Sequence, residues 1–507
     1  MQRLSFERPH ALHSVAATRA LEAASAKDLP THTLMQRAGM ATARLAMALA
    51  PHAQHIWIAC GSGNNGGDGL EAAVCLRQAG RNASVSWLGE PGRVPPDAQA
   101  SWQRAVAAGV PFLQGPPPPL EARDLCIDAL LGIGLKATAR EQRPPSEPLR
   151  QRLRQLRTSP ATLLAVDLPS GLDADTGQYA PGFAPDAQEL AAQRRHTLSL
   201  LTLKPGLFTA QGRDACGTVW HEDLGCGGHA LAQASTAQLG MALPTAGTRA
   251  QALHASHKGS FGDVAVIGGE GLQARGQGMT GAAWLAASAA LHGGAGRVMV
   301  ALLDDSPWPM APWPELMQRR INALDWPHLT AVCGCGGGEA VRGVLPIVLA
   351  QAARLVLDAD GLNAVASDHA LATALRQRAA RHQPTVLTPH PLEAARLLQS
   401  STQQVQADRL AAAQALARRY ACTVVLKGSG TVTATPGVLP CINPTGNARL
   451  ATAGTGDVLA GLIGARLAQG LAPHQAAALA VQAHGAAADR WPPHTSLTAS
   501  ALAAALQ

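Results

Sequence analysis

Aromatic residues and charges are both scarce in this chain of 507 residues. Phe, Trp and Tyr make up 3% of the sequence and charged residues 15%, whereas apolar residues make up 47%. A disordered chain carries more charge and less apolar material, so the composition predicts folded domains with apolar cores. At about 100–200 residues per domain, the length is sufficient for two to four domains.

No block of basic residues interleaved with aromatics is present, although the net charge is +7. The arginines are spread along the chain and are densest at 140–157 and 375–381. Recognition of nucleic acid needs a concentrated basic face or arm. The charge therefore favours an enzyme with anionic small-molecule ligands over a nucleic-acid-binding protein.

The cysteines do not form a zinc-binding pattern. Nine are scattered along the chain, and only Cys333 and Cys335 stand close together, as C-x-C. No second pair of Cys or His stands at the spacing of a zinc site. The pattern predicts buried free thiols in a reducing compartment.

Neither a leader peptide nor a membrane span is expected. Residues 1–14 are charged and lack the apolar segment of a signal peptide. The most apolar long run, 279–296, is rich in Ala and Gly, carries His292 and holds little Leu or Ile, so it predicts a buried helix. We expect a cytoplasmic protein without a membrane partner.

Short apolar runs alternate with helix-length segments in both halves of the chain. This alternation predicts βα units, mostly parallel sheets and the α/β fold class, with an antiparallel hairpin near 422–443. Between about 225 and 255 the residues are small and show no clear period. We place the domain boundary there, with one domain at 1–228 and the other at 235–507. The main runs are 55–60, 83–89, 125–132, 162–171, 196–203, 263–270, 297–304, 329–334, 354–360 and 384–390.

Residues 59–69 read ACGSGNNGGDG and lie between an expected strand and an expected helix. Gly61, Gly63 and Gly66 satisfy G-x-G-x-x-G, whose backbone N–H groups can bind phosphate at a helix N-terminus. A nicotinamide-dependent dehydrogenase also needs an acidic residue about 20 positions further on, at the end of the next strand. The nearest candidate, Glu90, lies in a Gly-Pro turn. A P-loop is excluded, because G-K-[ST] does not occur.

Polar residues are interleaved with the glycines of this loop. Asn64, Asn65 and Asp68 stand among five glycines in nine positions. Asn and Asp also stabilise ordinary turns, which leaves a structural interpretation open. Three of them in so short a loop favour a binding site.

Further polar residues follow strands of the same half. Asp128 closes LCID, Asp167 closes LLAVD, and Ser170 comes three residues later. Parallel strands end at one edge of a sheet, where ligands bind, so these side chains and Asn65 could converge. Their oxygens suit an alkali or alkaline-earth cation. Each aspartate taken alone could instead cap a helix.

A second glycine-rich turn, TAGTGD at 452–457, opens an expected helix and ends in Asp457. Its backbone donors can hold a transferring phosphoryl group while Asp457 deprotonates a hydroxyl nucleophile. KGSGT at 427–431 adds a lysine within reach of a nucleotide phosphate, and NPTGN at 443–447 adds a polar turn. Helix capping is the alternative for Asp457, and a core or capping role is the alternative for His390 in T-P-H-P.

Four motifs give the first half a family resemblance: GxGNNGGDG, DALLGIGLK, VDLPSGLDADTG and LTLKPGL stand in order over roughly residues 10–225. They resemble the epimerase domain of the NAD(P)H-hydrate repair enzymes, a Rossmann-like three-layer α/β/α fold. The resemblance implies that Asn65, Asp128 and Ser170 hold K⁺ and that Asp167 acts at the damaged nicotinamide ring. Gln36 stands where the family often has an acidic residue. The implied substrate contacts are Asn64, Asn65, Gly66, Gly67, Asp68, Gly132, Ile133, Gly134, Leu135, Lys136, Ala137, Thr138 and Asp167.

The second half resembles the ribokinase-like dehydratase domain of the same family from about residue 245 onward. HKGSFGDVAVIGG, MTGAAWLAASAALHGGAG, LDADGLN, LTPHPLEAARLL, VVLKGSGT and TAGTGDVLAG stand in family order. Two departures are visible: GCGGG at 334–338 replaces a G-P-G-L-G-like turn, and Leu392 replaces a glycine. The resemblance implies that Ala282, Gly336, His390 and Asp457 face the hydrated nicotinamide nucleotide. The implied adenine-nucleotide contacts are Lys427, Gly428, Ser429, Gly430, Thr431 and Gly456.

The resemblance implies a two-step repair of NADH or NADPH hydrated at C6. The first domain interconverts the R and S epimers with the help of K⁺. The second dehydrates the S form with Asp457 as base, with Mg²⁺, and with ADP converted to AMP and phosphate. The implied partners are the hydrated nucleotides and ADP, and we also expect a homo-oligomer.

Two other function classes stay open at this point. A ribokinase-like small-molecule kinase fused to a non-catalytic nucleotide-binding domain would share the G-x-G-D turn. An RNA-linked scaffold would share the N-terminal fold, but this chain retains Asn65, Asp128, Asp167 and Ser170 and carries no long disordered arm.

Overall fold

The computed structural model divides into two compact α/β units, as the alternation of strands and helices predicts. The first unit comprises Met1–Phe6 and His10–Ala237, and the second comprises Glu7–Pro9 and Gln238–Gln507. Part of the expected domain boundary, 228–234, lies outside the described residues. In the described part of the chain, every helix is too short or too polar to span a bilayer. The structure describes residues 1–136, 144–186, 189, 194–227, 235–241, 254–303 and 313–506.

A seven-stranded sheet in the order β1-β8-β7-β6-β5-β3-β4 forms the centre of the first unit. All neighbours pair in parallel except β1, which is antiparallel to β8. The central strands are apolar and buried along their length, as in sheets covered on both faces. The strands are β1 (Gln2–Arg3), β3 (Ile56–Cys60), β4 (Ala83–Trp87), β5 (Leu125–Ala129), β6 (Thr162–Val166), β7 (Arg195–Leu200) and β8 (Thr218–Glu222).

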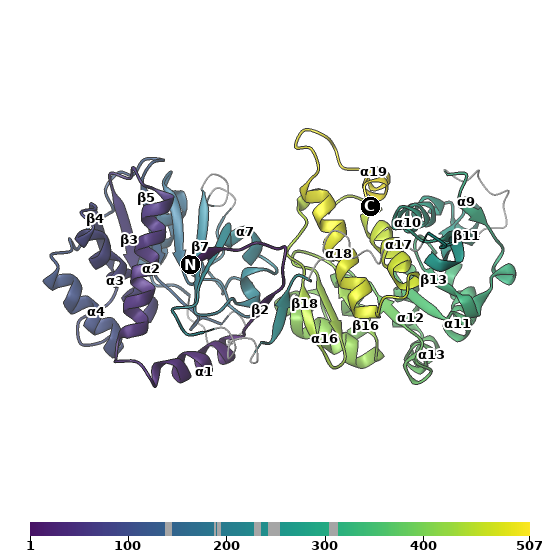
Figure 1. Ribbon diagram of the computed structural model, residues 1–507, viewed down its shortest axis with the longest axis horizontal. Coiled ribbons are helices and arrows are strands. Elements are labelled where there is room, and N and C mark those ends of the chain that lie inside the picture. Colours follow the sequence, from purple (N-terminus) through teal and green to yellow (C-terminus); the bar gives the residue numbers. More distant parts are fainter. Residues whose placement is uncertain are drawn as a thin grey trace. The chain divides into compact units, whose positions relative to one another are not determined.

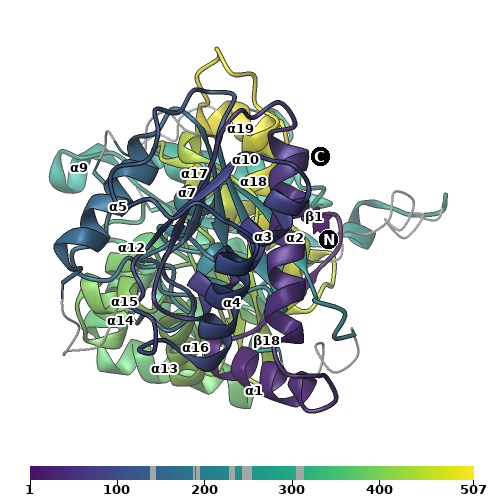
Figure 2. The ribbon, with the colours of Figure 1, turned by 90° about the vertical axis from the view of Figure 1, so that its left-hand side faces the viewer.

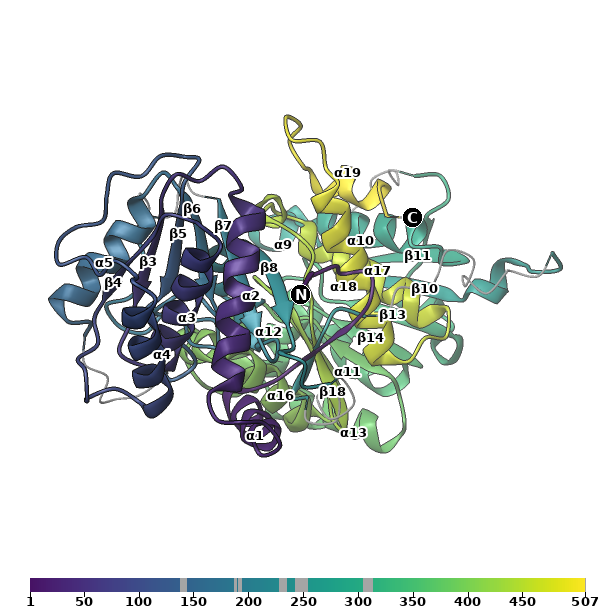
Figure 3. The same cartoon turned by 60° about the vertical axis from the view of Figure 1, so that its left-hand side comes forward.

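Helices cover both faces of this sheet and give the expected three layers (Figures 1 and 3). Ile56 and Ile58 of β3 pack in one apolar cluster with residues of α2, α3 and α4, and Trp57 packs in another with Leu153 and Leu156 of α5. Successive strand residues point to opposite faces, so one short strand serves both cores. The helices are α1 (Val15–Ala26), α2 (Thr33–Leu49), α3 (Asn64–Gln78), α4 (Pro96–Ala107), α5 (Glu147–Thr158) and α7 (Gly212–Cys216).

The second unit contains a larger sheet, in the order β12-β11-β10-β13-β14-β15-β16-β17-β18-β9. Pairing is parallel from β12 to β16 and antiparallel through β16, β17 and β18, which confirms the hairpin expected near 422–443. The strands are β9 (Ala237–Leu239), β10 (Asp263–Glu270), β11 (Arg297–Leu303), β12 (Met317–Gln318), β13 (Leu329–Cys333), β14 (Arg354–Leu357), β15 (Thr385–Leu387), β16 (Thr423–Leu426), β17 (Val432–Thr435) and β18 (Val438–Ile442).

Two groups of helices flank this sheet (Figures 1 and 2). On one face pack α10 (Thr280–His292), α17 (Thr455–Ala468), α18 (Pro473–Asp489) and α19 (Ala499–Ala504). The apolar run that predicts a buried helix is α10, and its small residues let α17 approach closely: a Cβ on Gly461 would lie 1.9 Å from Ala286 O. The other helices of the unit are α9 (Leu272–Arg275), α11 (Val341–Gln351), α12 (Ala359–Ser367), α13 (His369–Ala380), α14 (Pro391–Leu398), α15 (Thr402–Ala407) and α16 (Arg409–Tyr420).

All nine cysteines are free thiols, as the spacing predicts. Six are buried and three are partly buried.

Candidate active sites

A cavity of about 910 Å³ opens at the carboxyl edge of the first unit's sheet. This volume is within the range of small-molecule sites. Residues 130–135 after β5 line it, together with the glycine loop and Asp167. The predicted substrate contacts that line it are Asn64, Asn65, Asp68, Gly132, Ile133, Gly134, Leu135 and Asp167. The lining does not include Gly66, Gly67 or Lys136, and Ala137 and Thr138 lie outside the described residues.

The glycines of the first loop permit close backbone packing. A Cβ on Gly61 would lie 1.9 Å from Leu130 O, and one on Gly66 would lie 2.0 Å from Gly61 O. A Cβ on Gly67 would lie 2.5 Å from Met35 Sδ. These glycines bring the N-terminus of α3 against the loop after β5 and into the cavity wall, where its backbone N–H groups can bind an anion.

The residues predicted to hold a cation come together next to this loop. Asp128 Oδ1 accepts from Ser170 Oγ at 2.5 Å, and Asp128 Oδ2 accepts from Ser170 N at 2.9 Å. Leu131 links the group, because its N–H donates to Ser170 Oγ at 2.9 Å and its carbonyl accepts from Asn65 Nδ2 at 3.0 Å. Burial raises the pKa of Asp128, although the hydrogen bonds from Ser170 oppose the rise. Asn65 Oδ1 is buried without a hydrogen-bond partner.

Asp167 lies at the end of β6 with a φ of 68°, in the left-handed region that non-glycine residues rarely adopt. Its Oδ1 accepts from Leu200 N at 3.0 Å and from Lys204 Nζ. Lys204 is fully buried and also donates to Leu200 O at 2.8 Å. The ion pair therefore fixes the orientation of the Asp167 side chain at the cavity wall.

Two further acids line the same cavity. Burial raises the pKa of Asp68 well above its ordinary value, and the charge of Asp167 adds to the effect. Burial also raises the pKa of Glu22 of α1, and the charge of Asp167 adds a smaller effect in the same direction. The cavity thus combines the ion-paired carboxylate of Asp167 with two acids whose pKa values are raised.

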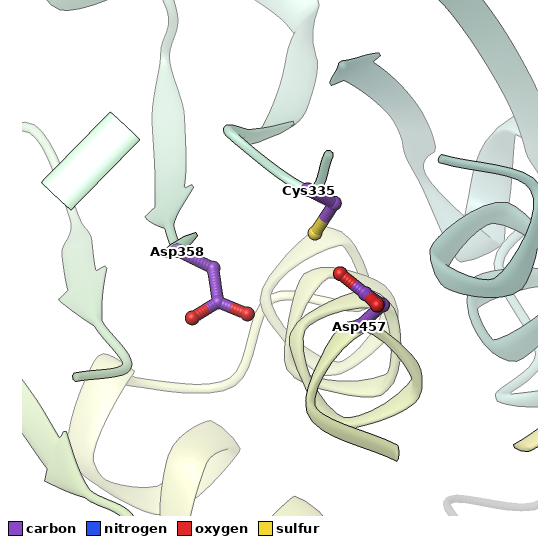
Figure 4. A group of neighbouring side chains, drawn as sticks. All are labelled: Cys335, Asp358 and Asp457. Carbon is purple, nitrogen blue, oxygen red and sulfur yellow. The ribbon is translucent and has the colours of Figure 1, made fainter. Parts of the chain in front are cut away.

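The second constellation lies at the carboxyl edge of the second unit's sheet, where the ends of β13, β14 and β16 meet the N-terminus of α17. The ligand atoms of Cys335, Asp358 and Asp457 lie within 4.8 Å of one another (Figure 4). Lys427 Nζ donates to Asp358 Oδ1 at 2.8 Å. A Cβ on Gly456 would lie 3.4 Å from Lys427 Nζ, so the lysine reaches the first turn of α17.

Burial raises the pKa of Asp457 to about 7, and the charge of Asp358 contributes in the same direction. A hydrogen bond from Cys335 and the charge of Lys427 oppose the rise. A carboxyl group that titrates near neutral pH can both take and return a proton under physiological conditions. This property, together with its place in the glycine-rich turn, makes Asp457 the strongest general-base candidate of this site.

Gly336 and Ala282 lie beside each other, and a contact of both with the substrate stays a prediction. Gly336 has a φ of 58°, and a Cβ there would lie 2.9 Å from Ala282 Cβ and 2.4 Å from Met279 O. The turn after β13 therefore lies against the start of α10, and a side chain at Gly336 would push the two apart.

His390 takes the capping role that the sequence left open. Its Nδ1 accepts from Leu392 N at 3.2 Å and Glu393 N at 3.3 Å, and Glu393 Oε2 accepts from His390 N at 2.8 Å. Burial and the charge of Lys427 lower the pKa of His390. A contact with substrate stays a prediction for this residue.

The predicted nucleotide loop is the turn between β16 and β17. Gly428 has a φ of 136°, and a Cβ there would lie 2.9 Å from the guanidinium of Arg409. The Arg409 guanidinium donates to Lys427 O at 3.1 Å and to Leu426 O at 3.2 Å. Burial lowers the pKa of Arg409 to about 10. Thr431 Oγ1 donates to Gly428 O at 3.0 Å. Gly428 and Ser429 of this turn are exposed, whereas Gly430 is buried.

The model of the NAD(P)H-hydrate dehydratase family matches residues 264–507, and that of the YjeF-related protein N-terminus matches residues 31–206. The bifunctional NAD(P)H-hydrate repair enzyme of Escherichia coli strain K12 is 35% identical over 478 residues, which cover 92% of this chain and 87% of that protein. The enzyme of the same description from Vibrio cholerae is 36% identical over 488 residues, covering 92% and 90%. The chain belongs to the bifunctional NAD(P)H-hydrate repair enzymes.

The family and the α/β fold class predicted from the sequence of this repair enzyme are thus confirmed. Among solved structures, an ADP/ATP-dependent NAD(P)H-hydrate dehydratase from Bacillus subtilis, co-crystallised with ATP and Mg²⁺, is 31% identical. The match covers 50% of this chain and 90% of that chain, with a TM-score of 0.42.

Sequence reasoning missed several residues of the repair enzyme's two sites. Lys204 stands in the motif LTLKPGL and Asp358 in the motif LDADGLN. Their place in these motifs was the signal by which they could have been found. Glu22 and Arg409 lie in helices without a motif, so nothing in their local sequence marks them. Cys335 stands in the C-x-C pair and in the changed turn GCGGG, and neither pattern marks it as a neighbour of Asp457.

Proposed function

We propose that this chain repairs NADH and NADPH hydrated at C6 of the nicotinamide ring. The first unit interconverts the R and S epimers, and the second unit dehydrates the S form while ADP is converted to AMP and phosphate. The observation that carries the dehydration step is Asp457, a half-buried carboxyl group with a pKa of about 7 in the first turn of α17. The family membership supports the pairing of the two activities.

In the dehydration, Asp457 accepts the proton of the C6 hydroxyl while the hydroxyl oxygen attacks the β-phosphorus of ADP. AMP leaves, and the hydroxyl, which is a poor leaving group, has become a phosphate ester. Loss of phosphate from C6 and of a proton from C5 then restores the dihydropyridine ring. The backbone N–H groups at the start of α17 and the ammonium of Lys427 stabilise the charge on the transferring group.

Mg²⁺ is proposed only as a companion of the nucleotide. In the described part of the chain, the one cluster with metal-ligand spacing is Cys335, Asp358 and Asp457. Mg²⁺ prefers oxygen ligands, whereas this cluster holds a thiol and a carboxylate already paired with Lys427. The cluster does not fit Mg²⁺, so no protein ligand and no step are assigned to the ion.

K⁺ fits the first unit. Asn65 has a buried oxygen without a hydrogen-bond partner, and Asp128 has a buried carboxyl group. A cation beside them would stabilise both, and Ser170 adds a hydroxyl oxygen. These three residues would hold the ion. When bound, K⁺ supplies positive charge beside the glycine loop and so favours the anionic pyrophosphate of the substrate.

Epimerisation removes the C6 hydroxyl and returns it to the other face of the ring. Loss of the hydroxyl needs a proton donor, and its return as water needs a proton acceptor. Asp167, held as a carboxylate by Lys204 at the cavity wall, takes the acceptor role. Burial and the charge of Asp167 raise the pKa of Asp68, which makes it the acid of the same cavity proposed to supply the proton.

Incubation with hydrated NADH and ADP tests the proposed function. The dihydronicotinamide absorbance should return, and chromatography should show that both epimers are consumed. If neither ADP nor ATP restores the absorbance, the proposed function is wrong. Phosphorylation of pyridoxal or hydroxymethylpyrimidine in the same assay would support the kinase alternative instead.

A homo-oligomer and a cytoplasmic location stay predictions for this chain. Light scattering after size-exclusion chromatography measures the molar mass in solution and tests the first. Fluorescence microscopy of the tagged protein in its own cell tests the second.

A further inference from the structure

Cys335 lies in the turn after β13, directly beside the proposed base of the dehydratase site. Its side chain is fully buried, and Figure 4 shows its sulfur directed toward the carboxylate of Asp457, with Asp358 nearby. It is the second residue of GCGGG, where the family resemblance has a G-P-G-L-G-like turn. A proline at that position has no side-chain donor, so the thiol gives this chain a contact that the related turn lacks.

The thiol is a hydrogen-bond donor and not a thiolate. Burial raises the pKa of Cys335 well above its ordinary value, and the charges of Asp457 and Asp358 raise it further. Its sulfur and a carboxylate oxygen of Asp457 lie within 4.8 Å of each other, so the neutral S–H is close enough to act as a donor toward that carboxylate. A thiol held in this form is a poor nucleophile and a poor target for oxidation. The thiol can therefore act as a hydrogen-bond donor and not as a nucleophile.

Four charged or polar groups from four elements act on the protonation of Asp457. Asp358 at the end of β14 and Asp360 of α12 favour the protonated form, since like charges repel. Lys427 at the end of β16 and the S–H of Cys335 favour the ionised form. Two further groups interact with Lys427: Glu393 of α14, whose charge raises the pKa of the lysine, and His390, which caps the start of α14. From α18, His484 bonds Thr455 O and is neutral, because burial lowers its pKa to about 4.

We propose that Cys335 is a positioning residue of the dehydratase site, whose buried thiol donates to the carboxylate of Asp457 and so favours the ionised, proton-accepting form of that base. The inference rests on the proposed function, because it assumes that Asp457 takes the proton of the C6 hydroxyl. In this step the proton moves from the hydroxyl oxygen to a carboxylate oxygen of Asp457, and the thiol keeps its own proton. No oxidant or other co-reactant takes part.

The chain provides a matched control in Cys333, which ends β13 two residues earlier. It is also fully buried, and its pKa is raised by burial without a contribution from Asp457. Replacing Cys333 tests the effect of losing a buried thiol from this region. Replacing Cys335 tests the same loss together with the hydrogen bond.

The experiment measures kcat/KM for dehydration against pH in wild type, Cys335→Ala, Cys335→Ser and Cys333→Ala, with Asp457→Asn as reference. The acid limb of the profile should move up by about one pH unit in Cys335→Ala, because a hydrogen bond to the charged form is lost. Cys335→Ser keeps a donor and should leave the limb at or below its wild-type position. Cys333→Ala should not move it.

An acid limb that stays in place in Cys335→Ala overturns the inference, provided that Asp457→Asn is inactive. If Asp457→Asn remains active, the proposed function itself fails, and the two failures are distinguishable. Should Cys335→Ala not fold, infrared spectroscopy of the wild type decides. The S–H band that is absent in Cys335→Ser should shift when Asp457 titrates and should not shift in Asp457→Asn. A band that does not respond to the titration overturns the inference.

Discussion

Lys427 Nζ lies 2.8 Å from Asp358 Oδ1, so the lysine predicted for the nucleotide loop is anchored at the centre of the dehydratase site. Burial alone would lower the pKa of Lys427, but the carboxylates of Asp358 and Glu393 reverse the effect and raise it. A fixed positive charge next to the first turn of α17 is what a transferring phosphoryl group needs. Through Asp358, the ion pair thus links the predicted nucleotide loop to Asp457.

Asp457→Asn should abolish dehydration and leave epimerisation intact. An amide cannot accept the proton of the C6 hydroxyl, and loss of a general base lowers rates by about 10²–10⁴-fold. Dehydration is followed by the dihydronicotinamide absorbance, and epimerisation by chromatographic separation of the R and S forms without nucleotide. Survival of both activities would show that the base has been assigned wrongly.

The rate of dehydration should rise with pH through about 7. Asp457 must be ionised to act as base, and its pKa of about 7 means that its reactive fraction grows as pH increases through that value. An ordinary aspartate, with a pKa near 3.9, would leave the rate flat in this range. The check is kcat/KM measured from about pH 5.5 to 8.5, with ADP binding measured separately. A flat profile contradicts the assignment.

The convergence of Asn65, Asp128 and Ser170 could be predicted from the sequence, because parallel strands end at a common edge and each residue lies at or after the end of a strand. The ion pair between Asp167 and Lys204 could not, although Lys204 also follows a strand. Lys204 reaches it only because the segment after β7 passes beside the end of β6, and that path depends on tertiary packing.

The pKa values of the site's acids could not be predicted from the sequence either. The pKa values of Asp457 and Asp68 depend on burial and on charges that come from distant segments. The family motifs identified the loops that carry these residues, but their titration follows from the surroundings that the fold builds around them.

Lys204→Met should inactivate the epimerase while the dehydratase keeps its activity. The substitution leaves the carboxylate of Asp167 buried without its cation, which costs about 3–5 kcal/mol of stability and frees the side chain from its fixed direction. Urea denaturation measures the stability of the first unit, and the two activity assays are run on the same protein. Arg93→Met, which removes an exposed ion pair with Glu90, is the control and should change neither. Full epimerase activity in Lys204→Met would exclude the positioning role of Lys204.

Removal of K⁺ should slow epimerisation and not dehydration. Replacing K⁺ by tetramethylammonium at constant ionic strength leaves Asn65 Oδ1 and Asp128 without a counter-charge, whereas the second unit contains no residue of that cluster. Asn65→Leu removes the partnerless oxygen and should make the remaining epimerase activity insensitive to K⁺. Equal activity with both cations in the wild type would argue against a K⁺ site at these residues.

Gly66→Ala should disrupt the epimerase site, and Gly63→Ala should be tolerated, although both glycines belong to the same G-x-G-x-x-G pattern. A Cβ on Gly66 would lie 2.0 Å from Gly61 O, within the loop's own backbone, whereas a Cβ on Gly63 meets nothing within 4 Å. Gly63 has a φ of −97°, which alanine adopts without strain. We expect Gly66→Ala to lower epimerase activity at least tenfold, because the displaced loop moves the N-terminus of α3 away from the cavity.

Gly63→Ala should stay within about threefold of wild type, unless the substrate approaches that backbone more closely than a methyl group allows. A large loss in Gly63→Ala with normal thermal stability would therefore locate the substrate's phosphates directly at Gly63, and normal activity in Gly66→Ala would contradict the packing role assigned to this glycine.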